Sequence, residues 1–281
     1  MDDVPTLYAT SDLHVTHTGN ETHVDVIRPD TPDDWLLVAG DVGERMSSVV
    51  DTLARLRERF ATVVWVPGNH ELWTTAKEPD ALSGAARYEE FVRRCRDIGV
   101  LTPEDEFPVW PYADRPLTIA PLFVLYDYTW RTPAATGVPV EEALRQARDA
   151  GVVCTDEYLL GHEPYPGRAA WCADRLEISE KRLAMIPDEH ETVLLSHWPL
   201  HRHPTEPLYY PEFAMWCGTT ETEDWHLRYR ARVAVYGHLH IPRTTYHDGV
   251  RFEEVSLGYP REWRRRTRGP VPFREILTSA G

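Results

Sequence analysis

Six short apolar runs, each rich in Val and Leu, constrain the fold of this chain more than any other feature of its sequence. Each run is closed by Gly, Pro, Asp or His, so polar residues gather at its C-terminal end. The runs lie within residues 6–14, 34–43, 61–71, 117–127, 192–199 and 232–240. Continuous apolar runs of this length are typical of strands that are buried on both faces. We therefore expect a sheet that is covered on both sides.

Helical periodicity alternates with these runs. Apolar residues recur at helical spacing in residues 44–60, 86–100 and 175–186, whereas residues 243–260 are again strand-like. Strands that alternate with helices predict the α/β class, as a layered sandwich with a mixed sheet or with two sheets. The 281 residues, 42% of them hydrophobic, allow one large domain or two small ones. We expect a single domain over residues 1–281.

A region at about residues 127–190 departs from this pattern. It is rich in aromatic residues and prolines, and residues 140–150 have its clearest helical pattern. It forms either a cap over a functional site or a peripheral insertion. Its aromatic rings either stack on a ligand or make up the core of the insertion itself. The sequence leaves both pairs of alternatives open.

The charge balance excludes several classes of partner. A formal net charge of −15 disfavours a general nucleic-acid coat and an anionic membrane surface, because long-range repulsion opposes both encounters. No stretch reaches the roughly 20 apolar residues that span a bilayer. The opening Met1-Asp2-Asp3 lacks the basic and apolar regions of a secretory signal. We expect a cytoplasmic protein, and the sequence is silent on its oligomeric state.

The four cysteines give no sign of a structural metal site or a redox pair. Cys95, Cys154, Cys172 and Cys217 are far apart, with no Cys-x-x-Cys spacing among them. We expect them to be buried thiols.

Metal-competent side chains follow five of the six apolar runs. They are Asp12 and His14, then Asp41, then Asn69 with His70, then His197, and finally His238 with His240. In an extended strand, residues i and i+2 project to the same side, so each Asp-Leu-His or His-Leu-His triplet aims two groups at one point. The carboxyl ends of parallel strands form the ligand-binding edge of α/β folds. The pattern therefore predicts a metal site at this edge.

Taken in order, these motifs resemble the signature of the calcineurin-like metallophosphoesterase superfamily. The matching segments are "SDLH", "GDVGER", "GNHE", "SHWP" and "GHLH", which extend from residue 11 to residue 240. The resemblance implies a layered α/β/β/α sandwich of mixed β-sheets flanked by helices. It also implies a dinuclear metal site at the C-terminal ends of the strands.

The resemblance also implies a division of the ligands. Asp12, His14 and His240 would hold one metal, Asn69, His197 and His238 the other, and Asp41 would bridge both. A bridging carboxylate suits two cations roughly 3.5–4 Å apart. Imidazole and oxygen ligands favour Mn, Fe, Zn or Co over Ca or Mg, and leave the choice among these transition metals open.

The implied chemistry is hydrolysis of a phosphate ester by a hydroxide that the two metals activate, so Asp41 counts as catalytic together with His70. His70 would contact the phosphate or the leaving group as general acid. The alternative is that His70 orients Asp12 or Asp41. Arg45 follows the bridging aspartate at a spacing seen in phosphatase branches and would grip phosphate, although a solvated charge at a helix start explains it as well.

The sequence does not specify the ester. A small-molecule phosphomonoester is slightly favoured over a phosphodiester such as a cyclic nucleotide, and a nuclease is disfavoured because the acidic chain lacks a basic track. The one basic run, residues 261–269, either reaches an anionic substrate or is solvated. A binding scaffold that keeps the fold without the chemistry is the rival class, but the chain retains every ligand. His17, His201 and His203 are further candidates to line the pocket.

Overall fold

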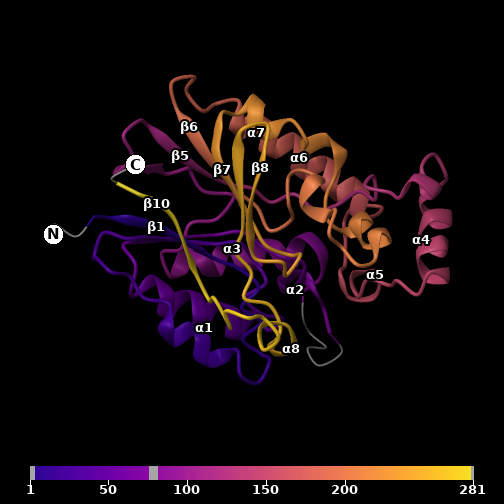
Figure 1. Ribbon diagram of the computed structural model, residues 1–281, viewed down its shortest axis with the longest axis horizontal. Coiled ribbons are helices and arrows are strands. Elements are labelled where there is room, and N and C mark those ends of the chain that lie inside the picture. The colour runs from indigo at the N-terminus through magenta and orange to yellow at the C-terminus, as the bar shows by residue number, and fades with distance from the viewer. Residues whose placement is uncertain (1–3, 76–81, 280–281) are drawn as a thin grey trace.

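A computed structural model of the chain describes residues 4–75 and 82–279 (Figure 1). Its strands are β1 (Thr6–Thr10), β2 (Trp35–Val38), β3 (Thr62–Trp65), β4 (Val109–Trp110), β5 (Leu117–Pro121), β6 (Glu191–Leu195), β7 (Ala231–Tyr236), β8 (Arg243–His247), β9 (Val250–Glu254) and β10 (Arg274–Thr278). Its α-helices are α1 (Met46–Arg57), α2 (Asn69–Leu72), α3 (Gly84–Asp97), α4 (Val140–Asp149), α5 (Asp156–Leu159), α6 (Arg168–Leu183), α7 (Trp225–Arg228) and α8 (Pro260–Trp263). Short 3-10 helices are η1 (Glu21–Val26), η2 (Pro133–Ala135), η3 (His203–Thr205), η4 (Pro211–Trp216) and η5 (Thr220–Thr222).

The strands form two mixed sheets. In the first sheet, of order β10-β1-β2-β3, strands β1 to β3 are parallel and β10 is antiparallel to β1. In the second, of order β4-β5-β6-β7-β9-β8, the four central strands are parallel and both edge strands are antiparallel to their neighbours. An isolated parallel bridge pairs Ser11 with Ser256, directly beyond the ends of β1 and β9. The carboxyl ends of strands from both sheets therefore meet.

Apolar side chains pack in three layers. Leu37 and Val64 of the first sheet pack on Val193 and Val233 of the second, which makes the core between the sheets. The other face of the first sheet packs on α1 and α3, and residues of α6 cover the other face of the second sheet. This arrangement confirms the α/β/β/α sandwich of mixed sheets.

The region at residues 127–190 forms much of the outer helical layer. Trp171 and Leu176 of α6 belong to the same buried cluster as Ala120 and Leu194 of the second sheet. Tyr158, by contrast, is 73% exposed. The aromatic residues of this region thus contribute mainly to its core, and its action as a cap stays a prediction.

The structure corrects one step of the sequence argument. The strands end earlier than expected, β1 at Thr10 and β7 at Tyr236, so the paired ligands do not project from extended strands. Asp12 and His14 have φ values of 52° and 42°, in the left-handed region. The pairs still converge, but they do so because tight loops turn their side chains inward.

All four cysteines are buried and free, as expected. Among the described helices, none combines the length and the apolar character that crossing a membrane requires.

Candidate metal centre

The predicted ligands lie on loops that the chain holds in a costly conformation. Asp12, His14, Asp41, His238 and His240 all have positive φ values, between 42° and 70°. A residue other than glycine in this region costs of order 1–3 kcal/mol and persists only where the surroundings enforce it. Such strain clusters at functional sites. Because this backbone strain is concentrated on five predicted ligands, these loops form one functional site.

Close loop packing requires glycine at two positions. A Cβ at Gly237 would collide with the side chains of Ser11 and Asp12, and a Cβ at Gly68 would collide with the Asp41 carboxylate. These glycines therefore let the loop after β7 approach the loop after β1, and the loop after β3 approach the loop after β2.

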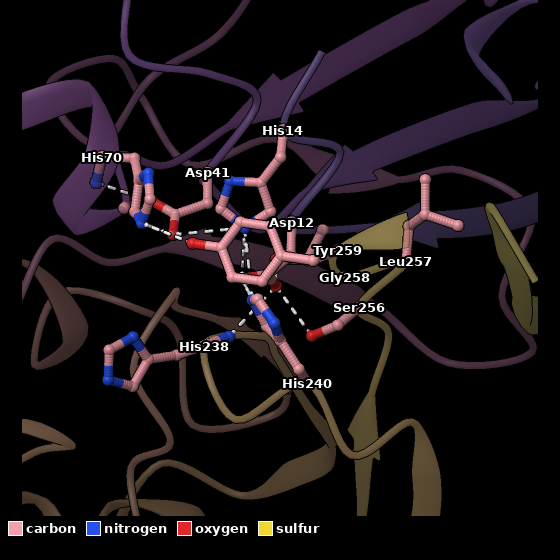
Figure 2. Close-up of polar contacts among 12 residues, drawn as sticks. Asp12, His14, Asp41, His70, His238, His240, Ser256, Leu257, Gly258 and Tyr259 are labelled. Atoms are coloured by element: carbon pink, nitrogen blue, oxygen red, sulfur yellow. Dashed lines mark hydrogen bonds and ion pairs between the residues drawn. The ribbon is translucent and has the colours of Figure 1, made fainter. Parts of the chain in front are cut away.

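The first ligand group brings together Asp12, His14 and His240, as the resemblance implies. The His240 Nε2 atom lies 2.9 Å from Asp12 Oδ1 and 3.2 Å from His14 Nε2. His14 Nε2 lies 3.8 Å from Asp12 Oδ1. Figure 2 shows these three side chains converging, with the Tyr259 ring lying across them. One carboxylate oxygen and two imidazole nitrogens thus face a common point.

The second ligand group brings together Asn69, His197 and His238. His197 Nε2 lies 3.1 Å from Asn69 Oδ1 and 3.2 Å from His238 Nδ1. Asp41 lies between the groups, because its Oδ2 atom is 3.5 Å from His197 Nε2 and 4.0 Å from His14 Nε2. All seven predicted ligands therefore meet, with Asp41 in the position expected of a bridge.

Neighbouring groups fix the orientation of the ligands. Ser11 Oγ and Ser256 Oγ donate hydrogen bonds of 2.6 and 2.7 Å to Asp12 Oδ2, which leaves Oδ1 facing the imidazoles. His240 Nδ1 lies 2.7 Å from Glu262 Oε2, so its Nε2 atom points inward. Imidazole ligands of metals characteristically use their second nitrogen in this way.

Glu71, the last residue of "GNHE", joins the loops after β2 and β3. Its buried carboxylate accepts hydrogen bonds from the backbone N–H groups of Asp41, Val42 and Gly68 at 2.6–2.9 Å. Burial raises the pKa of Glu71 to about 7, and these three N–H groups partly oppose that shift. Glu71 thus positions Asp41 without contacting the space between the ligand groups.

His70 lies beside the ligands rather than among them. Its Nδ1 atom is 3.0 Å from Glu44 Oε1, and its Nε2 atom is 3.2 Å from the Tyr259 hydroxyl and 3.8 Å from Asp41 Oδ2. Glu44 therefore orients the ring so that Nε2 faces the pocket. This placement suits a group that exchanges a proton with a substrate, and that role stays a proposal.

The structure places Arg45 away from the pocket. Its side chain is exposed at the residue before α1. The residues that line the pocket, which has a volume of about 230 Å³, are Asp41, Asn69, His70, Phe213, His238, Leu239, His240, Tyr259 and Glu262. The expected grip of Arg45 on phosphate thus has no support in the geometry. His17 lies near Glu44, whereas His201 and His203 belong to a different cluster.

The donor set fits transition metals. Burial, with the nearby carboxylates of Glu71 and Asp12, raises the pKa of Asp41 well above its usual range. Although burial opposes protonation of His240, the Asp12 and Glu262 carboxylates raise its pKa to about 10. Both shifts mean that Asp41 and His240 favour additional positive charge at these positions. Imidazole, carboxylate and amide donors without thiolate suit Mn, Fe, Zn or Co, and do not choose among them.

Tertiary packing adds residues that sequence reasoning missed. Tyr259 stacks on His14 with ring centroids 4.4 Å apart, and Glu262 follows on α8. Asp156 of α5 accepts hydrogen bonds from Asn69 Nδ2 and Trp73 Nε1 at 2.9 and 2.7 Å. Glu71 could have been found from the sequence, because it is the last residue of the motif "GNHE". Neither Asp156 nor Tyr259 carries a local signal, since each reaches the site from a distant part of the chain.

Known proteins share this fold and these motifs. A model of the calcineurin-like phosphoesterase family matches residues 5–242. The [acyl-carrier-protein] phosphodiesterase PptH of Mycobacterium tuberculosis (strain ATCC 25618 / H37Rv) is 54% identical over 262 residues, which cover 93% of this chain and 80% of that protein.

The crystal structure of the phosphopantetheinyl hydrolase PptH from Mycobacterium tuberculosis superposes with a TM-score of 0.93 at 52% identity, over 99% of this chain and 97% of the other. The family model covers the loops that bear all seven predicted ligands. This chain therefore belongs to the calcineurin-like phosphoesterase family and is a hydrolase.

Proposed function

We propose that the chain hydrolyses a phosphodiester, namely the bond that links a phosphopantetheinyl group to an acyl carrier protein. The similarity to PptH supports this reaction, because it extends over nearly the whole chain at more than half identity. The slight preference of the sequence analysis for a small-molecule phosphomonoester finds no support in these comparisons. The proposal therefore replaces it with a diester on a protein.

The charge of the pocket is the observation that carries the choice of ester. Among the described residues, those that line the pocket include no Lys or Arg, whereas Glu262 adds a carboxylate to the ligands. A monoester presents a dianion near neutral pH and a diester presents a monoanion. A site without cationic side chains beyond the metals is better matched to the monoanion, since it has less charge to neutralise.

The reaction consumes one water, breaks one P–O bond and yields a phosphomonoester and an alcohol. When bound, the metals supply Lewis-acid polarisation and a nucleophile at neutral pH. His70 lies in the pocket with Nε2 facing the position of a leaving oxygen, beside the Tyr259 hydroxyl. Burial lowers the pKa of His70, and the 3.0 Å contact of Nδ1 with Glu44 opposes that shift by stabilising the protonated form. We infer that His70 delivers the proton that the alkoxide needs to leave.

The basic run at residues 261–269 adjoins the pocket and supports a protein substrate. Arg261, Arg264, Arg265 and Arg268 are exposed, and none of them forms an ion pair with a described residue. They follow Tyr259 directly and surround Glu262, both of which line the pocket. Unpaired cations at the rim of a pocket attract an anionic protein surface at long range. We infer that this segment contacts the carrier protein.

Matched substrates test the choice of ester. The metal-loaded protein is incubated with a phosphopantetheinylated carrier protein, an aryl phosphomonoester and a bis-aryl phosphodiester, and each product is quantified. We expect release of phosphopantetheine from the carrier protein, with a kcat/KM above that of the monoester. Faster cleavage of the monoester, together with an intact carrier protein, would overturn the proposal.

Charge reversal tests the docking segment separately. In the double variant Arg264→Glu and Arg265→Glu we expect a KM for the carrier protein at least tenfold higher, with an unchanged rate on the bis-aryl diester. The double variant Arg115→Glu and Arg148→Glu, which reverses the charge of two other exposed arginines, is the matched control and should change neither value. An equal effect of both variants would show that net charge alone, rather than this segment, governs the encounter.

A further inference from the structure

A second cluster of histidines lies outside the candidate metal centre. It is made by His226 of α7, His247 at the end of β8, and Asp248 in the turn to β9. Figure 1 shows α7 and β8 at the same end of the second sheet. The ligands of the metal centre follow the carboxyl end of β7, whereas α7 directly precedes its amino end. The two clusters therefore occupy different places on the sheet.

The donor atoms of this cluster converge on one point. His226 Nε2 and His247 Nε2 each lie 3.2 Å from Asp248 Oδ2, and all three atoms lie within 4.8 Å of one another. A tetrahedral ion with ligand distances of about 2.0–2.1 Å places its donors about 3.3 Å apart. The two distances to Asp248 are thus close to the donor spacing around such an ion.

Packing holds the imidazoles in place. His226 is only 2% exposed and packs edge-on against Phe252, with ring centroids 5.5 Å apart. The ring of His201 lies 3.8 Å from that of His247, and His201 Nδ1 itself accepts a 3.0 Å hydrogen bond from the backbone N–H of His203. These ring contacts restrict the orientation of both imidazoles.

We propose that His226, His247 and Asp248 bind a third ion, a divalent transition metal such as Zn²⁺, with an open position toward solvent. Two imidazoles and one carboxylate form a ligand set that zinc uses when one position is left free. Asp248 is half exposed, so the ion has an entry path. The site is separate from the proposed hydrolysis and does not depend on it.

Metal stoichiometry tests this site directly. The whole protein is stripped with a chelator, incubated with excess Zn²⁺, desalted and analysed for zinc and protein. We expect three ions per chain for the native protein and two for His247→Ala. Equal zinc content in the native protein and in His247→Ala would overturn the proposal, because hydrogen bonds to Asp248 would then fully account for the cluster.

Two further variants keep the result interpretable. Asp248→Asn preserves the turn, because Asn tolerates the positive φ of 47° at this position before Gly249, and should also bind two ions. His162→Ala removes a partly buried histidine elsewhere and should keep all three. The rate on the bis-aryl diester should be unchanged in His247→Ala, which distinguishes loss of this site from loss of the catalytic centre.

Discussion

Tyr259 is the residue that distinguishes this site from the motifs that predicted it. It lies beyond residue 242, where the family model ends, yet its ring stacks on His14 and its hydroxyl lies 3.2 Å from His70 Nε2. The ring therefore covers one side of the centre, and the hydroxyl contacts the proposed proton donor. Tyr259 therefore adds a group to the site from outside the motifs.

Replacement of the Tyr259 hydroxyl should slow the reaction without disturbing the metals. In Tyr259→Phe the ring still stacks on His14, but His70 loses a hydrogen-bond partner worth about 1 kcal/mol. We expect kcat to fall about fivefold, with little change in KM and unchanged metal content. The loss should be larger for an alkyl leaving group than for a nitrophenyl one, which leaves without a proton.

Tyr165→Phe is the matched control, because its hydroxyl also donates to a side chain, Asp174, but lies outside the pocket. An equal loss on both leaving groups in Tyr259→Phe would contradict a part in proton delivery and would leave only a structural role.

At the scale of residues, the sequence predicted the site residues that lie within its motifs and no others. All seven proposed ligands lie within four residues of the end of a strand, and such a position is a local property that the sequence reveals. Tyr259, Glu262 and Asp156 reach the site through tertiary packing, to which no local pattern points. Arg45 is the opposite case. Its spacing, which is seen in phosphatase branches, predicted a contact with phosphate, but the side chain is exposed and does not line the pocket.

Elements are positioned at the site by contacts between loops. The loops after β2 and β3 share the Glu71 carboxylate, and they approach so closely that Gly68 has no room for a side chain. Gly68 has φ −100° and ψ −175°, which any residue adopts. The requirement for glycine at this position is therefore purely one of space.

Gly68→Ala should weaken metal binding without straining its own backbone. The added Cβ would collide with the Asp41 carboxylate and lie 2.7 Å from the Asp41 backbone nitrogen, so the bridging ligand must move. We expect at least a tenfold loss of metal affinity and of kcat/KM, measured by titration of the stripped protein and by diester hydrolysis.

Gly167→Ala is the control, because it is also extended and nothing lies within 4 Å of its Cβ position. Full metal affinity in Gly68→Ala would show that these loops separate easily.

The strands and helices themselves were predictable, because burial produces a characteristic pattern of apolar residues in the sequence. The apolar runs became β1, β2, β3, β5, β6 and β7, and the helical stretches became α1, α3 and the second half of α6. The ends of the strands were less predictable, since the runs continue into loops that are also buried. Because the apolar runs continue in this way, the sequence analysis assigned the ligand pairs to extended strands. The structure shows instead that these residues have left-handed backbone conformations.

At the scale of the whole molecule, the proposed metals connect the two sheets. Asp12, Asp41 and Asn69 follow strands of the first sheet, whereas His197 and His238 follow strands of the second. Asp156 adds a contact from the region at residues 127–190 through Asn69. Metal binding should therefore strengthen the junction between the two sheets as well as support catalysis.

Removal of the metals should lower the melting temperature. An ion that binds only the folded state stabilises it by about 2.7 kcal/mol at a concentration 100 times its Kd. For a domain of this size that corresponds to a shift of about 5–10 °C. We expect a chelator to lower Tm by at least this amount, measured by calorimetry, and added Mn²⁺ to restore it.

In His247→Ala, which lacks the proposed third site, chelation should still lower Tm, and the shift that remains belongs to the centre between the sheets. Asp41→Asn should melt at a temperature that no longer depends on the metal, because the bridge between the two ion positions is weakened. If chelation removes both ions and Tm stays unchanged, the sheets are held together by their apolar interface alone. The ions would then serve the reaction without contributing to the fold.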